Sequence, residues 1–150
     1  MLADKTEVLG RCRGPRLLTP HPGEMKRLFD FDKTSRVETA RKFCNRYPVT
    51  LLFKGSRTIV CESDRPVSYN STGNPGMATG GSGDVLTGVC AGLLGQKLIP
   101  YDAARVGAWI CGRAAEIAVF QSGQSEESLL PGDIADHLGA AFNDLRSPQV

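Results

Sequence analysis

The chain has 150 residues, of which 41% are hydrophobic and 23% are charged, and both values fit one globular domain with its own core. Its 18 basic and 16 acidic residues leave a net charge of +2 without a basic cluster, which argues against nucleic acid as a partner. The first residues lack the apolar core of a signal peptide and no apolar stretch is long enough to span a membrane, so we expect no membrane partner.

Alternating strand and helix patterns fill the first half of the chain. The apolar run at 49–53 predicts a strand that is buried on both sides. Ser35 followed by Glu38 is typical of a capping box at the start of a helix that Pro48 closes. The predicted elements of this half are a strand at 16–20, a helix over 23–29, a helix over 35–47 and strands at 49–53, 58–62 and 67–70.

Helical spacing dominates the second half. The predicted helices cover 83–96, 101–121 and 133–145, and the middle one carries small residues that let a helix lie close to a neighbour. Strands alternating with helices indicate a layered α/β fold, and the chain as a whole is predicted to be a single domain, 1–150.

The cysteines form an odd, scattered set without a C-x-x-C pair. They do not predict a disulfide framework or a zinc site. Small buried thiols in a reducing compartment are the simpler interpretation, so we expect a cytoplasmic protein. The five positions are Cys12, Cys44, Cys61, Cys90 and Cys111.

A glycine-rich stretch, NPGMATGGSGDVLTG at 74–88, leads into the first of the three later helices. Glycines let backbone N–H groups converge on a ligand, and the helix adds its positive end, so the stretch is a candidate phosphate site. It matches neither G-x-x-x-x-G-K-[ST] nor G-x-G-x-x-G.

Asp84 is the one charged residue of that stretch, and two interpretations of it stay open. A carboxylate in a first helical turn stabilises the helix dipole. Beside a phosphate site it would also repel the anion, unless it takes the proton of a hydroxyl that attacks the phosphoryl group.

Three ordered blocks resemble the ADP- or ATP-dependent NAD(P)H-hydrate dehydratases of the ribokinase-like superfamily. They are LTPHPGEMKRL at 18–28, KGSRT at 54–58 and TGNPGMATGGSGDVLTGVCAGLLGQ at 72–96. The resemblance implies a layered α/β/α fold and a lyase of metabolite repair. A nucleotide phosphorylates the hydroxyl of hydrated NADH or NADPH, phosphate leaves, and the nicotinamide ring regains its double bond. ADP is the expected donor, with ATP as the alternative, and Mg²⁺ accompanies the nucleotide.

The resemblance also implies roles for particular residues. Asp84 matches the catalytic, substrate-side carboxylate of the family, and no residue is assigned as a metal ligand. The other substrate-binding residues are His21, Pro22, Gly23, Glu24, Met25, Lys26 and Arg27. The nucleotide-binding residues are Lys54, Gly55, Ser56, Arg57 and Thr58, together with Asn74, Pro75, Gly76, Met77, Ala78, Thr79, Gly80, Gly81, Ser82 and Gly83.

Two further residues have simpler interpretations. His137 on the last predicted helix is expected to be a surface residue. Trp109, among small residues of the long helix, is expected to pack rather than to stack on a ligand.

Members of the family are longer than this chain, which corresponds to the C-terminal part of their domain. Because an open strand edge promotes aggregation, we expect either a homo-oligomer or a missing N-terminal half to cover it. Two other functions stay open. One is a ribokinase-like kinase for a small molecule, and the other is a truncated nucleotide-binding module without catalytic activity.

Overall fold

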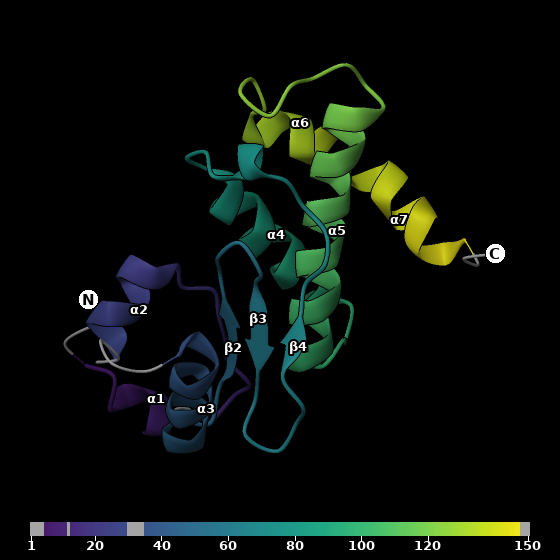
Figure 1. The fold of residues 1–150 in the computed structure, drawn as a ribbon. Coiled ribbons are helices and arrows are strands. Elements are labelled where there is room, and N and C mark those ends of the chain that lie inside the picture. The colour runs from purple at the N-terminus through teal and green to yellow at the C-terminus, as the bar shows by residue number, and fades with distance from the viewer. Residues whose placement is uncertain (1–4, 12, 30–34, 148–150) are drawn as a thin grey trace. The chain divides into compact units, whose positions relative to one another are not determined.

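The structure is a computed structural model that describes residues 5–11, 13–29 and 35–147. Two compact units make up the chain (Figure 1). The first contains Met1–Asn70 and Ile99–Ala104, and the second contains Ser71–Leu98 and Arg105–Val150. The prediction of a single domain remains a prediction.

The first unit holds a four-stranded sheet with the strand order β1-β2-β3-β4. β1 pairs with β2 in parallel, whereas β2, β3 and β4 pair in antiparallel fashion. All four residues of β2 are buried, which confirms the predicted strand with two covered faces. The strands are β1 (Leu17–Leu18), β2 (Thr50–Phe53), β3 (Ile59–Cys61) and β4 (Ser68–Tyr69).

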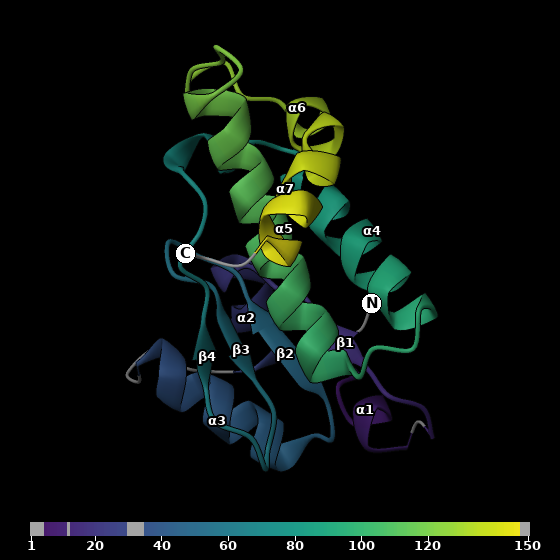
Figure 2. The ribbon, with the colours of Figure 1, turned by 90° about the vertical axis from the view of Figure 1, so that its right-hand side faces the viewer.

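Helix α3 (Arg36–Arg46) packs on the sheet of the first unit, beside β2 and β3 (Figure 2). Its buried face carries Ala40, Phe43 and Cys44, which join Leu51 and Phe53 of β2 in one core cluster. The predicted helix over 35–47 is therefore confirmed. Two shorter helices, α1 (Val8–Arg11) and α2 (Pro22–Leu28), complete the unit.

The predicted start of α3 is present, although the capping box is incomplete. The amide of Glu38 donates to the Ser35 hydroxyl oxygen at 3.1 Å. The Glu38 carboxylate lies 2.8 Å from Lys42 Nζ, one helical turn onward. The Glu38 carboxylate therefore forms a surface ion pair with Lys42, four residues onward, whereas a capping box would have it accept from the Ser35 amide.

The second unit is helical, with α4 (Ser82–Gly95) beside α5 (Pro100–Phe120), which belongs to this unit from Arg105 onward (Figures 1 and 2). A Cβ on Gly107 of α5 would come within 2.6 Å of Cys90 Sγ on α4, so the close approach depends on a small residue. The predicted small-residue packing of α5 is confirmed. No helix in the described part of the chain is apolar over enough length to cross a membrane.

The last predicted helix is in fact two helices, α6 (Pro131–Asp136) and α7 (Leu138–Arg146). The break falls at His137, whose backbone leaves the helical conformation with φ −98° and ψ 2°. Its ring nitrogens lie 2.7 Å from the Asp133 carbonyl oxygen and 2.8 Å from Ser122 Oγ. His137 is therefore half-buried and bonded, not the free surface residue that we expected.

The described cysteines are free thiols, as predicted. Cys44, Cys61, Cys90 and Cys111 are all buried, while Cys12 lies outside the described residues. Burial raises the pKa of Cys90 to about 11 and that of Cys111 to about 12. Such thiols are inert at neutral pH because the reactive thiolate is scarce.

Candidate functional site

The glycine-rich stretch enters α4 through a left-handed residue. Gly81, the N-cap, has φ 96° and ψ −20°, and a Cβ there would come within 2.9 Å of Pro131 Cγ. Only glycine satisfies both conditions. Asp84 follows in the first helical turn, and it is exposed. Its carboxylate is therefore open to a ligand at the positive end of a 14-residue helix.

Several donors at this helix start have no acceptor within the described residues. The amides of Gly80, Gly81 and Gly83 donate to no protein group there. The hydroxyl oxygen of Ser82 is buried and makes no hydrogen bond. Gly80 and Gly81 are exposed, and N–H groups left free at a helix start are where anionic ligands bind, so this cluster fits an anion that would accept from these groups.

The beginning of the same loop is fastened to α5. The amide of Gly73 donates to Glu116 Oε1 at 2.8 Å. Asn74 donates from Nδ2 to the Ala115 carbonyl at 3.0 Å and accepts at Oδ1 from the Gly76 amide at 3.0 Å. Both polar ends of the Asn74 side chain therefore shape the loop. Glu116 was not predicted from the sequence, because its partner lies 43 residues away in the chain.

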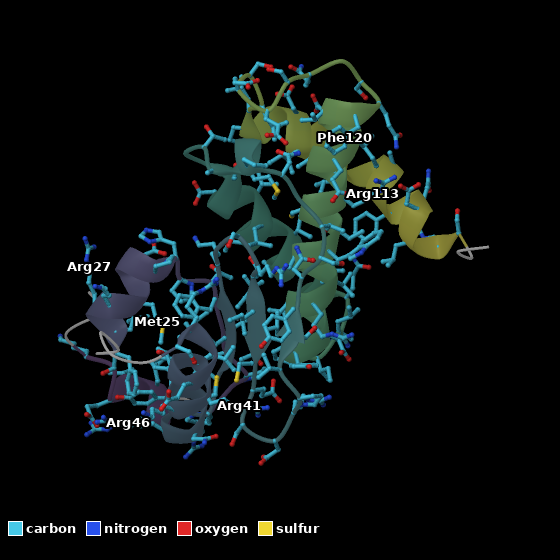
Figure 3. All side chains as sticks on the ribbon, viewed as in Figure 1. Met25, Arg27, Arg41, Arg46, Arg113 and Phe120 are labelled. Carbon is cyan, nitrogen blue, oxygen red and sulfur yellow. The ribbon has the colours of Figure 1, made fainter. Side chains whose placement is uncertain are left out.

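A cavity of about 420 Å³ opens next to this fastening. Arg113 lies between α5 and α7 (Figure 3), with Nε 2.6 Å from Asp144 Oδ2 and Nη1 3.2 Å from Glu116 Oε2. These hydrogen bonds raise the pKa of Arg113, first through Asp144. The charged groups of the cavity are thus paired with one another. Its lining residues are Thr72, Trp109, Arg113, Glu116, Asp144 and Ser147.

In the first unit, the predicted substrate segment begins as a helix cap. His21 Nδ1 accepts from the amides of Gly23 and Glu24 at 3.0 and 3.3 Å, and Glu24 Oε2 accepts from the His21 amide at 2.7 Å. These bonds form a complete capping box at α2. Nε2 of the same ring lies 3.6 Å from Glu24 Oε2, so both ring nitrogens face groups of the cap.

The side chains of α2 divide between the core and the solvent. Met25 is fully buried in the core cluster, whereas Lys26 and Arg27 are exposed. Figure 3 shows Met25 turned inward and Arg27 turned outward. Of the predicted substrate residues on this helix, Met25 therefore anchors the segment in the core, and Lys26 and Arg27 lie on its exposed face.

Lys54 joins two of the predicted sites. Its Nζ lies 3.7 Å from Glu24 Oε2, and its amide donates to the Pro20 carbonyl at 2.9 Å. The pKa of Glu24 is lowered, mainly by the hydrogen bond from the His21 amide and further by the charge of Lys54. The structure thus brings the start of the KGSRT loop against the start of α2. Gly55, Ser56 and Arg57 follow as an exposed turn.

Thr58 closes that turn. Its Oγ1 donates to the Gly55 carbonyl at 3.3 Å. The loop at 54–58 and the loop at 74–83 belong to different units, so each is a separate candidate here.

A family model described as NAD(P)H-hydrate dehydratase matches residues 1–138. The chain belongs to the NAD(P)H-hydrate dehydratase family. The resemblance predicted from the three sequence blocks is therefore confirmed.

Two curated relatives illustrate how the match is distributed. A bifunctional NAD(P)H-hydrate repair enzyme from Moorella thermoacetica is 46% identical over 148 residues, which cover 96% of this chain and 28% of that protein. An ADP-dependent (S)-NAD(P)H-hydrate dehydratase from Neisseria meningitidis is 36% identical over 90% of this chain and 47% of its own length. The chain spans less than half of either relative.

Solved structures confirm the fold. The Bacillus subtilis ADP/ATP-dependent NAD(P)H-hydrate dehydratase, co-crystallised with ATP/Mg²⁺ and soaked with CoA, superimposes with a TM-score of 0.81 and 30% identity. This match covers 89% of the present chain and 50% of that one. A ribokinase-like superfamily protein from Enterococcus faecalis gives 0.72 at 28% identity, over 89% of this chain and 46% of its own. The chain has part of the ribokinase-like α/β fold, as predicted.

Proposed function

We propose that this chain carries the nucleotide-binding and phosphoryl-transfer part of an ADP-dependent (S)-NAD(P)H-hydrate dehydratase, a hydro-lyase of metabolite repair. One observation carries the proposal: unpaired glycine amides and a buried, unpaired Ser82 hydroxyl lie at the start of α4, directly before an exposed carboxylate at Asp84. Family membership and the names of the relatives support it.

The amides at the start of α4 would hold the terminal phosphate of the nucleotide. Their N–H groups and the helix dipole complement the negative charge that spreads over the phosphoryl oxygens during transfer. The exposed KGSRT loop of the first unit, which carries the cation Arg57, is proposed as a second nucleotide-binding segment. ADP is the proposed donor, and ATP is the alternative that the name of the B. subtilis enzyme includes.

Asp84 would take the proton from the hydroxyl of the hydrated nicotinamide ring. The freed oxygen then bonds to the terminal phosphorus as the bond to the donor breaks. In the following step the C–O bond breaks, phosphate leaves, and the neighbouring carbon loses a proton as the ring double bond re-forms. General-base help of this kind typically contributes about 10²- to 10⁴-fold in rate.

The Mg²⁺ that accompanies the nucleotide would be held chiefly by its phosphates and by water. No group of three His, Cys, Asp or Glu side chains that could hold a metal ion occurs in the described part of the chain. Mg²⁺ commonly binds in this way, through substrate phosphates with few protein ligands. The ion would neutralise phosphate charge during transfer.

The segment from His21 to Arg27 would bind the hydrated dinucleotide. The exposed side chains of Lys26 and Arg27 would contact its ribose or phosphates, since His21 Nδ1 and Met25 are used by the fold. We place this chemistry in the cytoplasm, where the dinucleotide pool of metabolism lies.

The remaining part of the fold would come from a further segment or from a second copy of the chain. β1 is an edge strand of only two residues in the first unit. Further strands could pair there, and the solved relatives are about twice as long as this chain. Covering that edge would also protect it from aggregation.

The proposal is tested by turnover. The chain and an Asp84→Asn variant are incubated with hydrated NADH, ADP and Mg²⁺, and re-formed NADH is followed by absorbance. We expect the variant to lose about 10²-fold or more in kcat while it still binds ADP, because the side chain keeps its size and loses only its basicity. Equal rates would remove Asp84 from the mechanism.

Two other outcomes identify the alternatives. A stable phosphorylated product would indicate a small-molecule kinase. ADP binding without turnover at any concentration of the chain would indicate a non-catalytic nucleotide-binding module, an outcome that its coverage of only half of its relatives makes worth testing.

A further inference from the structure

Arg36, the first residue of α3, reaches the end of β2 and the start of the KGSRT loop. Its Nη2 donates to two successive carbonyl oxygens, that of Phe53 at 3.0 Å and that of Lys54 at 2.9 Å. The guanidinium carbon also lies 4.8 Å from the centre of the Phe53 ring. One side chain thus contacts both the backbone where the strand ends and the last buried ring of that strand.

Gly55 is shaped to receive this guanidinium. A Cβ at Gly55 would come within 2.6 to 2.8 Å of three guanidinium atoms of Arg36. Its backbone has φ +154°, a conformation that residues with a side chain rarely adopt. The guanidinium therefore lies flat against bare backbone at the second residue of the predicted nucleotide loop.

This placement of Arg36 is unfavourable by itself. Its Nε is buried without a hydrogen-bond partner among the described residues, and burial lowers the pKa of the guanidinium. The guanidinium is partly buried, and a donor left unsatisfied in such a place reduces stability. A role in positioning the loop would account for a group of this kind at its end.

We propose that Arg36 is the positioning residue of the nucleotide loop at 54–58, setting the direction in which that loop leaves β2. The inference rests on the proposed nucleotide-binding role of this loop. Arg36 does not itself touch the nucleotide. It holds the Lys54 carbonyl, while the Lys54 amide is held by the Pro20 carbonyl and Lys54 Nζ by Glu24.

The consequence is that Lys54 is fixed from both sides of its backbone. The direction of the turn at 55–57 follows from that, because the turn is exposed and begins at Lys54. Losing Arg36 should therefore loosen the turn selectively, and should leave β2 and the core beneath it in place.

The test compares Arg36→Ala, Arg36→Lys and a control on the same helix, Arg46→Ala. Arg46 is 58% exposed, and its partners within the described residues are the surface residue Glu7 at 3.5 Å and the Tyr47 ring. Two quantities are measured for each protein: the Kd for ADP by calorimetry, and amide hydrogen exchange at 54–58 relative to α3 and β2.

We expect Arg36→Ala to raise the Kd for ADP about tenfold or more and to speed exchange at 54–58 alone. Arg36→Lys should recover part of both, because an ammonium can reach a carbonyl but cannot lie flat on Gly55. Arg46→Ala should match the wild type. Should the alanine variant fail to fold, the lysine variant decides by the same two readings.

The inference is overturned if Arg36→Ala binds ADP as the wild type does, or if exchange rises equally in α3, β2 and the loop. The second result would mean that Arg36 stabilises the first unit as a whole and does not position the loop. If the wild-type chain binds no ADP, the proposed function fails instead. In that case hydrogen exchange by itself tests whether Arg36 positions the loop. Unchanged exchange at 54–58 in Arg36→Ala would reject that role.

Discussion

The two candidate loops are fixed by opposite kinds of group. In the first unit, the loop at 54–58 is held through its carbonyls by a donor, the guanidinium of Arg36. In the second unit, the loop leading to α4 is held at Gly73 through its amide by an acceptor, the carboxylate of Glu116. The first fastening lies at Lys54, the first residue of its loop, and the second lies at Gly73 and Asn74.

The two loops present different groups to a ligand. The first loop presents an exposed turn with the cationic side chain of Arg57, whereas the second presents glycine amides without acceptors. The first therefore offers side-chain charge, which is mobile and screened by salt. The second offers backbone donors that are fixed in direction before any ligand arrives, which is the arrangement that favours phosphoryl transfer.

The largest effect that would test this difference is expected at Gly81. Gly81→Ala places a side chain at φ 96° and against Pro131, so we expect the free energy of unfolding to fall by about 1–3 kcal/mol and ADP binding to weaken sharply. Denaturant unfolding and calorimetry measure both.

The matched control is Gly88→Ala on the same helix. Gly88 has open space where a Cβ would lie, so alanine there should raise stability by up to about 1 kcal/mol and leave ADP binding unchanged. If Gly81→Ala and Gly88→Ala had the same stability and the same affinity for ADP, the left-handed conformation of Gly81 would contribute to neither.

A smaller effect is expected at the fastening of the second loop. Glu116→Ala removes the acceptor of the Gly73 amide and one partner of Arg113, so stability should fall by about 1–3 kcal/mol, and Glu116→Gln should lose less because it keeps an acceptor. Thermal unfolding ranks both variants against the wild type. Equal melting temperatures for the wild type and both variants would show that the hydrogen bonds of Glu116 contribute nothing to stability.

The smallest effect concerns Glu24 in the first unit. Its pKa is lowered in the folded chain, so its carboxylate stabilises the fold above the ordinary titration range of a glutamate, and this stability is lost as the pH falls through the lowered value. Glu24→Gln should therefore melt slightly below the wild type at pH 7 and level with it in acid. A difference that persisted at low pH would assign the effect to something other than charge.

Local chemistry made much of the fold predictable. Helix α5, predicted over 101–121, runs from Pro100 to Phe120, and α4, predicted over 83–96, runs from Ser82 to Gly95. Their apolar spacing and the prolines and glycines at their ends lie within the segments themselves. The buried β2 was predictable for the same reason, since its apolar run is continuous.

Contacts between distant residues account for what was missed. The break at His137 depends on a bond to Ser122, 15 residues earlier, and no periodic pattern records such a partner. Arg36 and Glu116 hold loops 18 and 43 residues away, so the sequence marks the loops through their glycines but not the side chains that fix them. The substrate and nucleotide roles of the predicted residues remain predictions.

The central claim is that the glycine amides before Asp84 receive the phosphate of the nucleotide. Titrating the ¹⁵N-labelled chain with ADP, and separately with adenosine, while recording amide shifts tests it most directly. We predict large shifts at Gly80, Gly81 and Gly83 with ADP and small ones with adenosine, which lacks phosphate. Saturating ADP that left these three amides unmoved, or adenosine that moved them equally, would contradict the account.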